Sequence, residues 1–433
     1  MDRSIELFLQ LLSGAIHDRR CTIKELPAES EWELLYKYSS SQNVLPMIYD
    51  QLAKSGLWKM AADRIPVTDR ENPEYEQLEI ALKFRKLFEQ QALSLFMTQV
   101  NRTETFYSDY QDMNKAGFFP VIVKGIICRN SYPNPEQRPS GDEDLLITEE
   151  EYPAFKQHLL ERGFYLVNEE QDTEMVEAAE FRHPGTGAFY EVHVRLMPLT
   201  SEYYRQFNRV FENAFEQTGL IDINGHTIRI LDHTLHLFFL FCHFLKHFIA
   251  GGVGIRQLCD IVLYSKKYCD EISWSRIDGW IQTYKLEKLW MSIIKFSEEY
   301  LGCEWNHKAL PAFEVKPAEP LNMLTDMLEG GAFGTLDQER VHSIRMTVKA
   351  AESGRPDPVG GMIKSLFPGM DHMKKSYPIL DSRPFLLPIM YGDRVIKYIR
   401  KKKRNPHRSG KLSPVAVGNQ RIQLLSEYGV ISE

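Results

Sequence analysis

Cysteines and long apolar runs are both scarce in this sequence. Its 433 residues include six cysteines, scattered along the chain without any CxxC spacing, which is typical of a reduced, cytoplasmic protein. The most apolar stretch, 235–250, is short for a bilayer span and is interrupted by polar side chains (His236, His243, Lys246 and His247). We therefore expect a buried helix there and no membrane span. The N-terminal segment lacks a small-residue cleavage site, so it favours a helix over a signal peptide.

An excess of positive charge is also missing. Lys and Arg number 52 against 59 Asp and Glu, for a net charge of −7, which argues against a general nucleic-acid coat protein. The exception is 394–411, which carries nine basic residues. We expect 385–390 to pack on the body of the protein and the basic run to be exposed. Because the run has few aromatic residues to stack on bases, we predict no specific nucleic-acid binding.

The length fits two or three domains, and the pattern changes twice along the chain. Apolar spacing predicts helices through 1–117, with a break near Pro46 and a long helix over 79–114 that ends at Gly117. Residues 231–433 are again predicted to be mainly helical, with the basic tail segment near their end. The middle region, 118–230, has a different character.

Short β-branched runs and turn signals in 118–230 predict an α/β domain with a small mixed sheet, so the fold class is α+β. Asn224-Gly225 is a hairpin turn signal within an alternating segment, 221–230. The other predicted strands are 118–123, 142–147, 164–168 and 188–196, and the predicted helices are 126–132 and 150–162.

Two aspartates stand at the start of the predicted strand 142–147. Side chains at positions i and i+2 of a strand share a face, so Asp142 and Asp144 should lie side by side. Adjacent carboxylates repel each other unless a cation lies between them, and Mg²⁺ takes oxygen ligands. The alternative is a solvated strand start, where acidic residues are common. Gly141 allows a tight turn into the strand.

Two further features favour a site. In the predicted strand 188–196, Glu191, His193 and Arg195 share one face, and Glu191 would add a third carboxylate if that strand lies beside the first. The alternative there is an ordinary half-buried strand with a polar face. Lys124-Gly125 ends an earlier buried strand, where backbone N–H groups can approach a phosphate.

Together these motifs resemble the nucleotidyltransferase superfamily that includes DNA polymerase β, and more closely a family of uncharacterised bacterial nucleotidyltransferases. The residues that carry the resemblance are Lys124-Gly125, Tyr132-Pro133, Arg138, the Gly-Asp-x-Asp-Leu-Leu motif at 141–146, and Glu191-Val192-His193. The segments 32–52 and 243–261 are similar to that family's helical parts. The chain departs from the superfamily at Ile126, where a serine usually follows the glycine, and from the family at Val194, where a tryptophan is usual.

The resemblance implies a polymerase-β-like domain that transfers a nucleoside monophosphate from an NTP, ATP among them. Asp142, Asp144 and Glu191 would be the catalytic carboxylates and would hold Mg²⁺ or Mn²⁺. The acceptor stays open among a small molecule, a protein and RNA. The residues expected to contact the nucleotide are Lys124, Gly125, Arg138, Gly141, His193 and Arg256.

Two pairs in the later helical region have competing interpretations. His243 and His247 are four residues apart and share a helix face. They are either a pair of histidines at a domain interface or residues that line the nucleotide cleft. Arg256 and Asp260 are also four residues apart. They either form an ion pair along the helix or face the cleft.

Two other functions stay open. One is a catalytically inactive nucleotidyltransferase fold that acts as a binding module. The other is a metal-dependent glycosyltransferase, which also uses an Asp-x-Asp motif, although such enzymes usually begin with a nucleotide-binding βαβ unit rather than ~115 helical residues.

Overall fold

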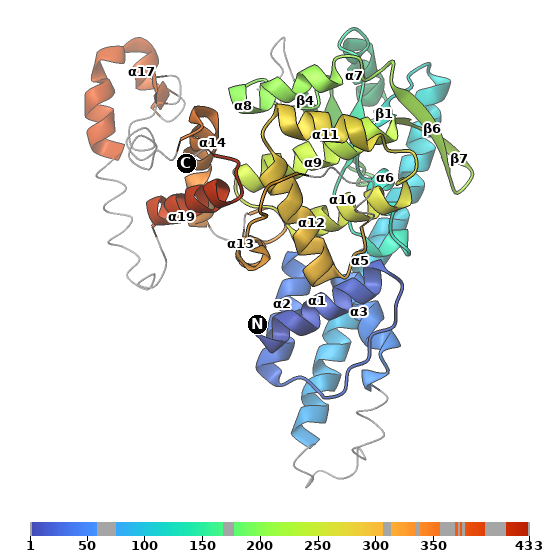
Figure 1. Cartoon of the computed structure of the whole chain (residues 1–433). Helices are drawn as coiled ribbons and strands as arrows, with labels where there is room; N and C mark the ends of the chain where they lie inside the picture. The colour runs from blue at the N-terminus through green and yellow to red at the C-terminus, as the bar shows by residue number, and fades with distance from the viewer. Residues whose placement is uncertain are drawn as a thin grey trace.

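The computed structural model describes residues 2–58, 75–167, 177–305, 313–334, 336, 338–355, 369–370, 373–374, 377–394 and 413–431. The chain begins with helices α1 (Arg3–Ile16), α2 (Glu29–Ser41), α3 (Leu45–Lys54) and α5 (Tyr75–Lys115). Pro46 lies in the first turn of α3, where its missing N–H costs nothing. The predicted long helix is α5, and Gly117 follows it with a φ of +91°. Helices α1, α2 and α3 and the first part of α5 form the lower part of the molecule in Figure 1, and α5 continues upward beside strand β7 (His226–Leu231).

A seven-stranded mixed sheet confirms the predicted α+β class. The strand order is β3-β4-β5-β2-β1-β7-β6. β2 runs parallel to β5 and β1 parallel to β7, and the other pairs are antiparallel. The strands are β1 (Val121–Ile122), β2 (Glu143–Leu146), β3 (Tyr165–Leu166), β4 (Ala178–Arg182), β5 (Phe189–His193), β6 (Thr218–Ile223) and β7 (His226–Leu231).

The predicted hairpin is β6–β7. Asn224 and Gly225 have φ angles of 53° and 81°, the left-handed pair of a tight two-residue turn. The hairpin extends the same sheet, because Ile230 pairs with Ile122. β4 was not predicted, since its sequence lacks an alternating apolar pattern. The short elements between strands are α6 (Ile126–Arg129), η1 (Pro135–Gln137), α7 (Tyr152–Glu161), α8 (Glu202–Arg205) and η3 (Gln206–Phe211).

The C-terminal region is helical, as predicted. The stretch 235–250 lies in α9, whose side chains are almost all buried, so this apolar helix is part of the core. Among the helices of the described residues, none is both long enough and apolar enough to cross a membrane. The helices are α9 (His233–Ile249), α10 (Ile255–Lys267), α11 (Trp274–Thr283), α12 (Glu287–Leu301), α13 (Pro320–Gly330), α14 (Gln338–Ser353), α17 (Ile379–Ser382), η4 (Pro384–Leu386) and α19 (Pro414–Glu427).

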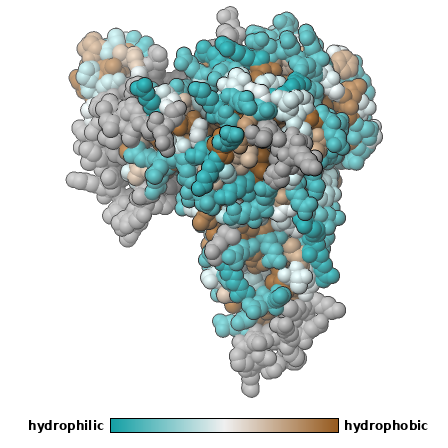
Figure 2. All heavy atoms as spheres, in the orientation of Figure 1, coloured by the Kyte–Doolittle hydropathy of each residue, from teal (hydrophilic) through white to brown (hydrophobic). Residues whose placement is uncertain are grey.

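The expectation that 385–390 packs on the body is wrong. Phe385 is 74 % exposed and Ile389 61 % exposed, and apolar surface shows at the upper left of Figure 2, in the region of α17. Apolar side chains in an amphipathic spacing do not by themselves show which surface buries them. Beyond Arg394, the predicted basic run lies outside the described residues.

Candidate active site

Strands β2 and β5 bring together three side chains that could hold a metal ion. In their parallel register Asp144 pairs with Glu191, and Leu146 with His193, so the polar side chains share one face of the sheet. One ligand atom each from Asp144, Glu191 and His193 lie within 4.8 Å of one another. The expected proximity of Glu191 and Asp144 is therefore found, whereas Asp142, the third expected metal ligand, does not belong to this cluster. His193, expected only to contact the nucleotide, has a ring nitrogen within this cluster.

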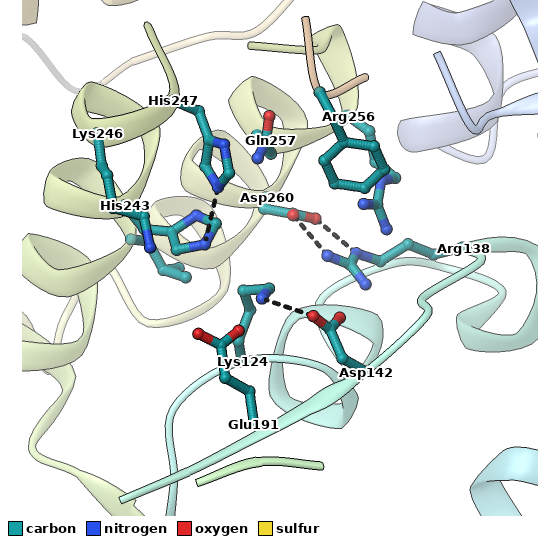
Figure 3. A pocket seen from close by; sticks show the side chains of 12 residues that line it. Lys124, Arg138, Asp142, Glu191, His243, Lys246, His247, Arg256, Gln257 and Asp260 are labelled. Carbon is teal, nitrogen blue, oxygen red and sulfur yellow. Dashed lines mark hydrogen bonds and ion pairs between the residues drawn. The ribbon is translucent and has the colours of Figure 1, made fainter. Parts of the chain in front are cut away.

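Lys124 is the cation that faces these carboxylates. Its Nζ lies 2.6 Å from Asp144 Oδ2 and 3.7 Å from Asp142 Oδ2. Burial lowers the pKa of Lys124, but the negative charges of Asp142, Asp144 and Glu191 raise it by more. The pKa of Lys124 therefore lies above its ordinary value. The repulsion between carboxylates that suggested a metal is relieved here by a lysine of the chain itself. Figure 3 shows Lys124 between Asp142 and Glu191.

Asp144 is the most buried carboxylate of the group, with 1 % of its side chain exposed. Burial raises the pKa of Asp144, but the charge of the Lys124 ammonium lowers it by more. His193, whose Nε2 lies 3.3 Å from Asp144 Oδ1, lowers it further. The pKa of Asp144 is therefore below its ordinary value, and the carboxylate is ionised at neutral pH. An ionised, buried carboxylate is a strong ligand for a hard cation.

Glu143, between the two aspartates, points the other way and is structural. Its Oε1 lies 2.5 Å from Arg129 Nη2, and its Oε2 accepts a hydrogen bond from the Ile126 N–H at 2.6 Å. Gly125 has a φ of +65°, and a Cβ there would lie 1.9 Å from Glu143 Oε2. The glycine is thus required for the approach of Glu143. Because the Ile126 N–H already has a partner, the phosphate contact expected of Gly125 stays a prediction.

A buried ion pair joins the loop before β2 to helix α10. Arg138 donates to Asp260 through two nitrogens, at 2.7 and 2.6 Å, and the Tyr132 hydroxyl donates to the same carboxylate at 2.7 Å. Arg138 is 1 % exposed. Asp260 thus pairs with Arg138, 122 residues away in the sequence, while Arg256 donates to the Pro139 carbonyl.

Two buried guanidinium nitrogens near this ion pair lack a partner. Within the described part of the chain, Arg138 Nη1 and Arg256 Nε have no hydrogen-bond acceptor. Buried donors are normally paired, and charged ones cost the most when they are not. Burial, and then the neighbouring Arg138, lower the pKa of Arg256. An anion is the ligand that would satisfy both groups.

These groups line one cavity of about 220 Å³ between the sheet and helices α9 and α10. In Figure 3 the carboxylates of Asp142 and Glu191 lie on the sheet side, and His243 and His247 face them from α9. The Nε2 atoms of the two histidines lie 3.3 Å apart, and burial lowers the pKa of His243 well below its ordinary value, so its imidazole is neutral. The lining residues are Lys124, Arg138, Asp142, Glu191, Leu240, His243, Lys246, His247, Arg256, Gln257, Asp260 and Phe333.

Other expected residues lie elsewhere. Gly141 is exposed, and a Cβ there would meet nothing within 4 Å, so it does not need to be glycine for space. His193 belongs to the ligand cluster rather than to the cavity lining. The sequence did not indicate Lys246 or Phe333 as cavity residues.

A second cavity, of about 550 Å³, lies beyond the ends of β2 and β5. It is larger, but it contains none of Asp144, Glu191 and His193. Its charged side chains are exposed and of both signs, for example Arg209 and Glu212. The smaller cavity, where buried charges converge, is therefore the candidate active site.

Comparison with known proteins gives one match. Residues 28–302 match a family model described as an uncharacterised nucleotidyltransferase. The matched residues run from before α2 through the sheet to the end of α12, and so include the carboxylates, Lys124, Arg138 and Arg256. No curated protein and no solved structure matches the chain.

Proposed function

The chain belongs to the uncharacterised nucleotidyltransferase family, and from this premise we propose that it transfers a nucleoside monophosphate from an NTP to an acceptor with the help of Mg²⁺ or Mn²⁺. Asp142, Asp144 and Glu191 are the proposed catalytic carboxylates, with His193 as a further ligand. The acceptor is a small molecule, a protein or RNA. All six cysteines are free, which supports a reducing, cytoplasmic location.

The observation that carries the proposal is the clustering of Asp144, Glu191 and His193 at the edge of a charged cavity. Carboxylate oxygens are the ligands that Mg²⁺ and Mn²⁺ prefer, and Asp144 and Glu191 supply them in this cluster. A bound metal ion would neutralise the charge of the triphosphate and of the leaving pyrophosphate.

The opposite wall of the cavity suits phosphate. Among the residues that the structure describes, Arg138 and Arg256 each have a buried nitrogen without a hydrogen-bond partner, and Lys246 adds a third cation. Guanidinium groups bind phosphate oxygens with strong, directional hydrogen bonds. Carboxylates on one wall and guanidinium groups on the other are the arrangement that a metal-bound triphosphate needs.

The chain's own residues act by positioning. In the proposed reaction the acceptor oxygen forms a bond to the α-phosphorus, the bond from that phosphorus to the bridging oxygen of the β-phosphate breaks, and pyrophosphate leaves. The acceptor hydroxyl gives up its proton to solvent water. Arg138, held by Asp260, would fix the phosphates in line with the acceptor.

One observation favours the binding-module alternative. Lys124 forms an ion pair with Asp144, so this buried carboxylate has a counter-charge without a metal ion. In an inactive fold this ion pair would be permanent, and nucleotide would bind without being transferred.

Labelled nucleotides test the reaction. Each NTP, labelled at either the α- or the γ-phosphate, is incubated with Mg²⁺ and with small-molecule, protein and RNA fractions of a cell extract. The proposal predicts that only the α-label enters an acceptor and that Asp144→Asn abolishes the transfer. Transfer of the γ-label would show a kinase instead, and tight nucleotide binding with no transfer in any fraction would favour the binding module.

A further inference from the structure

A loop from the C-terminal helices reaches the candidate site. Phe333 lies between α13 and α14, and it lines the same cavity as Asp142 and Glu191. The family match ends at residue 302, so this loop lies outside it. Part of the cavity wall is therefore supplied by a region to which the family description assigns nothing.

The backbone of this loop is packed closely against the turn between α9 and α10. Gly331 and Gly334 have φ angles of +71° and +66°, which favour glycine. A Cβ on Gly334 would lie 2.1 Å from the carbonyl carbon of Gly251, so the two backbones are in direct contact. Arg340 Nη1 also donates to the Gly251 carbonyl, at 3.1 Å. The segment 331–334, which carries Phe333, is thus packed against the turn between α9 and α10.

A cluster of buried charged side chains connects three C-terminal helices to one another and to the end of α9. Asp326 of α13 accepts hydrogen bonds from Arg340 of α14, at 2.9 Å, and from Arg421 of α19. Arg421 donates in addition to the Phe248 carbonyl of α9. All three charged side chains are at most 8 % exposed, and buried charges are tolerated only when paired in this way. Three helices thus fix one loop against α9.

Phe333 itself is not part of the core that this arrangement builds. Its residue is 48 % exposed, at the opening of a cavity whose other lining residues are mostly charged or polar. Its ring centroid lies 6.4 Å from that of His247, and the two ring planes are inclined at 62°. The face of the phenyl ring is thus an apolar surface held in place beside a cavity for charged groups.

The size of the cavity shows which part of a nucleotide could meet this ring. About 220 Å³ is less than the roughly 300–1,000 Å³ of common ligand pockets. The triphosphate belongs inside, where the guanidinium groups and carboxylates lie. The base then has to extend to the opening, where Phe333 is exposed.

We propose that Phe333 is the platform on which the base of the bound NTP stacks, and that the C-terminal helices hold it there. The inference rests on the proposed function and adds a base-binding residue to it. Stacking on an aromatic ring needs only the π-face that every base has. The site should therefore accept all four bases, with purines bound more tightly because their rings are larger.

The test compares a nucleotide with a ligand that has no base. Dissociation constants of ATP and of inorganic tripolyphosphate, each with Mg²⁺, are measured for the wild type, Phe333→Leu and Phe333→Trp. Leucine keeps the apolar bulk and removes the π-face. We expect Phe333→Leu to weaken ATP binding roughly tenfold, as loss of one base–aromatic stack implies, and to leave tripolyphosphate binding unchanged. Phe333→Trp should bind ATP at least as tightly as the wild type.

Phe385→Leu is the matched control, because Phe385 is 74 % exposed in η4 and does not line the cavity. It should bind both ligands as the wild type does. Equal ATP affinity in Phe333→Leu and wild type would overturn the stacking inference and leave the proposed function standing. An equal loss for ATP and tripolyphosphate would also overturn it, since the ring would then act on the phosphates or on the fold. A wild type that binds neither ligand with Mg²⁺ would overturn the proposed function itself.

Discussion

The ammonium group of Lys124 lies 2.6 Å from the carboxylate of Asp144, so the most buried acid of the site already has a cation from the chain itself. A metal ion that binds Asp144 must compete with this ammonium. Nucleotide phosphates would offer Lys124 another partner, so metal and NTP should bind better together than either does alone.

Replacing Lys124 should therefore strengthen metal binding in the absence of nucleotide. Lys124→Met leaves Asp142, Asp144 and Glu191 without their cation, and we expect Mn²⁺ to bind at least about tenfold more tightly than to the wild type. Mn²⁺ titration followed by electron paramagnetic resonance measures this. Lys246→Met is the control, because Lys246 lines the same cavity without an ion pair to these carboxylates. Unchanged affinity in Lys124→Met would mean that the lysine does not compete with the metal.

The buried pair Arg138–Asp260 should behave as a unit. Arg138→Leu leaves the Asp260 carboxylate buried without its ion-pair partner and should lower the free energy of unfolding by about 3–5 kcal/mol. Asp260→Leu should lower the free energy of unfolding by a similar amount. The loss in the double variant should be clearly smaller than the sum of the two single losses. Urea denaturation measures all three. Arg195→Leu breaks an exposed pair with Glu149 and should cost under about 1 kcal/mol. An Arg138→Leu cost as small as this control would contradict the account.

His236 should make the fold sensitive to acid. It is fully buried and donates its Nε2–H to the Val123 carbonyl at 2.9 Å, and burial lowers its pKa to about 3. As the pH falls below the ordinary value of 6.5, the unfolded chain takes up a proton that the folded chain does not. The free energy of unfolding should then fall by up to about 1.4 kcal/mol per pH unit between pH 6.5 and 3.

Denaturation at pH 7.5, 6.0 and 5.0 tests this dependence. His236→Gln keeps an N–H donor for Val123 and removes the titrating group, so its unfolding free energy should fall less steeply with acid. His342→Gln, at an exposed position on α14, should keep the wild-type slope. The same slope in His236→Gln and wild type would show that His236 is not the source.

Gly125→Ala should destabilise the fold through Glu143. The added Cβ would lie 1.9 Å from Glu143 Oε2, and the φ of +65° disfavours alanine. We expect a loss of more than about 2 kcal/mol in urea denaturation. Gly279→Ala is the control, because its Cβ meets nothing within 4 Å in helix α11, where alanine is favoured by up to about 1 kcal/mol. Equal stabilities of the two variants would reject the role given to Gly125.

Local signals in the sequence predicted much of this architecture. Asn224-Gly225 marked the hairpin, and Pro46 marked the break between two helices, α2 and α3. The alternation of side chains along a strand indicated that Asp142 and Asp144 share a face. These features depend on the backbone conformation of a few neighbouring residues, and they are visible in one segment at a time. The domain boundaries and the chemical roles of the site residues stay predictions.

Other features depend on residues far apart in the chain. Alternation indicated that Glu143 points away from its aspartate neighbours, but not that Arg129 would be its partner. Asp260 has an arginine four residues before it, yet it pairs with Arg138. Phe333 lines the cavity together with Asp142 and Glu191, which lie far from it in the sequence. Pairings of this kind are decided by tertiary packing, so one sequence does not reveal them.

Nucleotide and metal binding test the central proposal most directly. Thermal unfolding of the wild type and of the double variant Asp142→Asn, Asp144→Asn is measured with ATP, GTP, CTP and UTP, each with and without Mg²⁺. The account predicts that Mg²⁺ and NTP together raise the unfolding temperature of the wild type, because they bind only the folded state, and that the double variant shows no such shift from its own baseline. Equal shifts in wild type and variant, or a shift that does not need Mg²⁺, would contradict it.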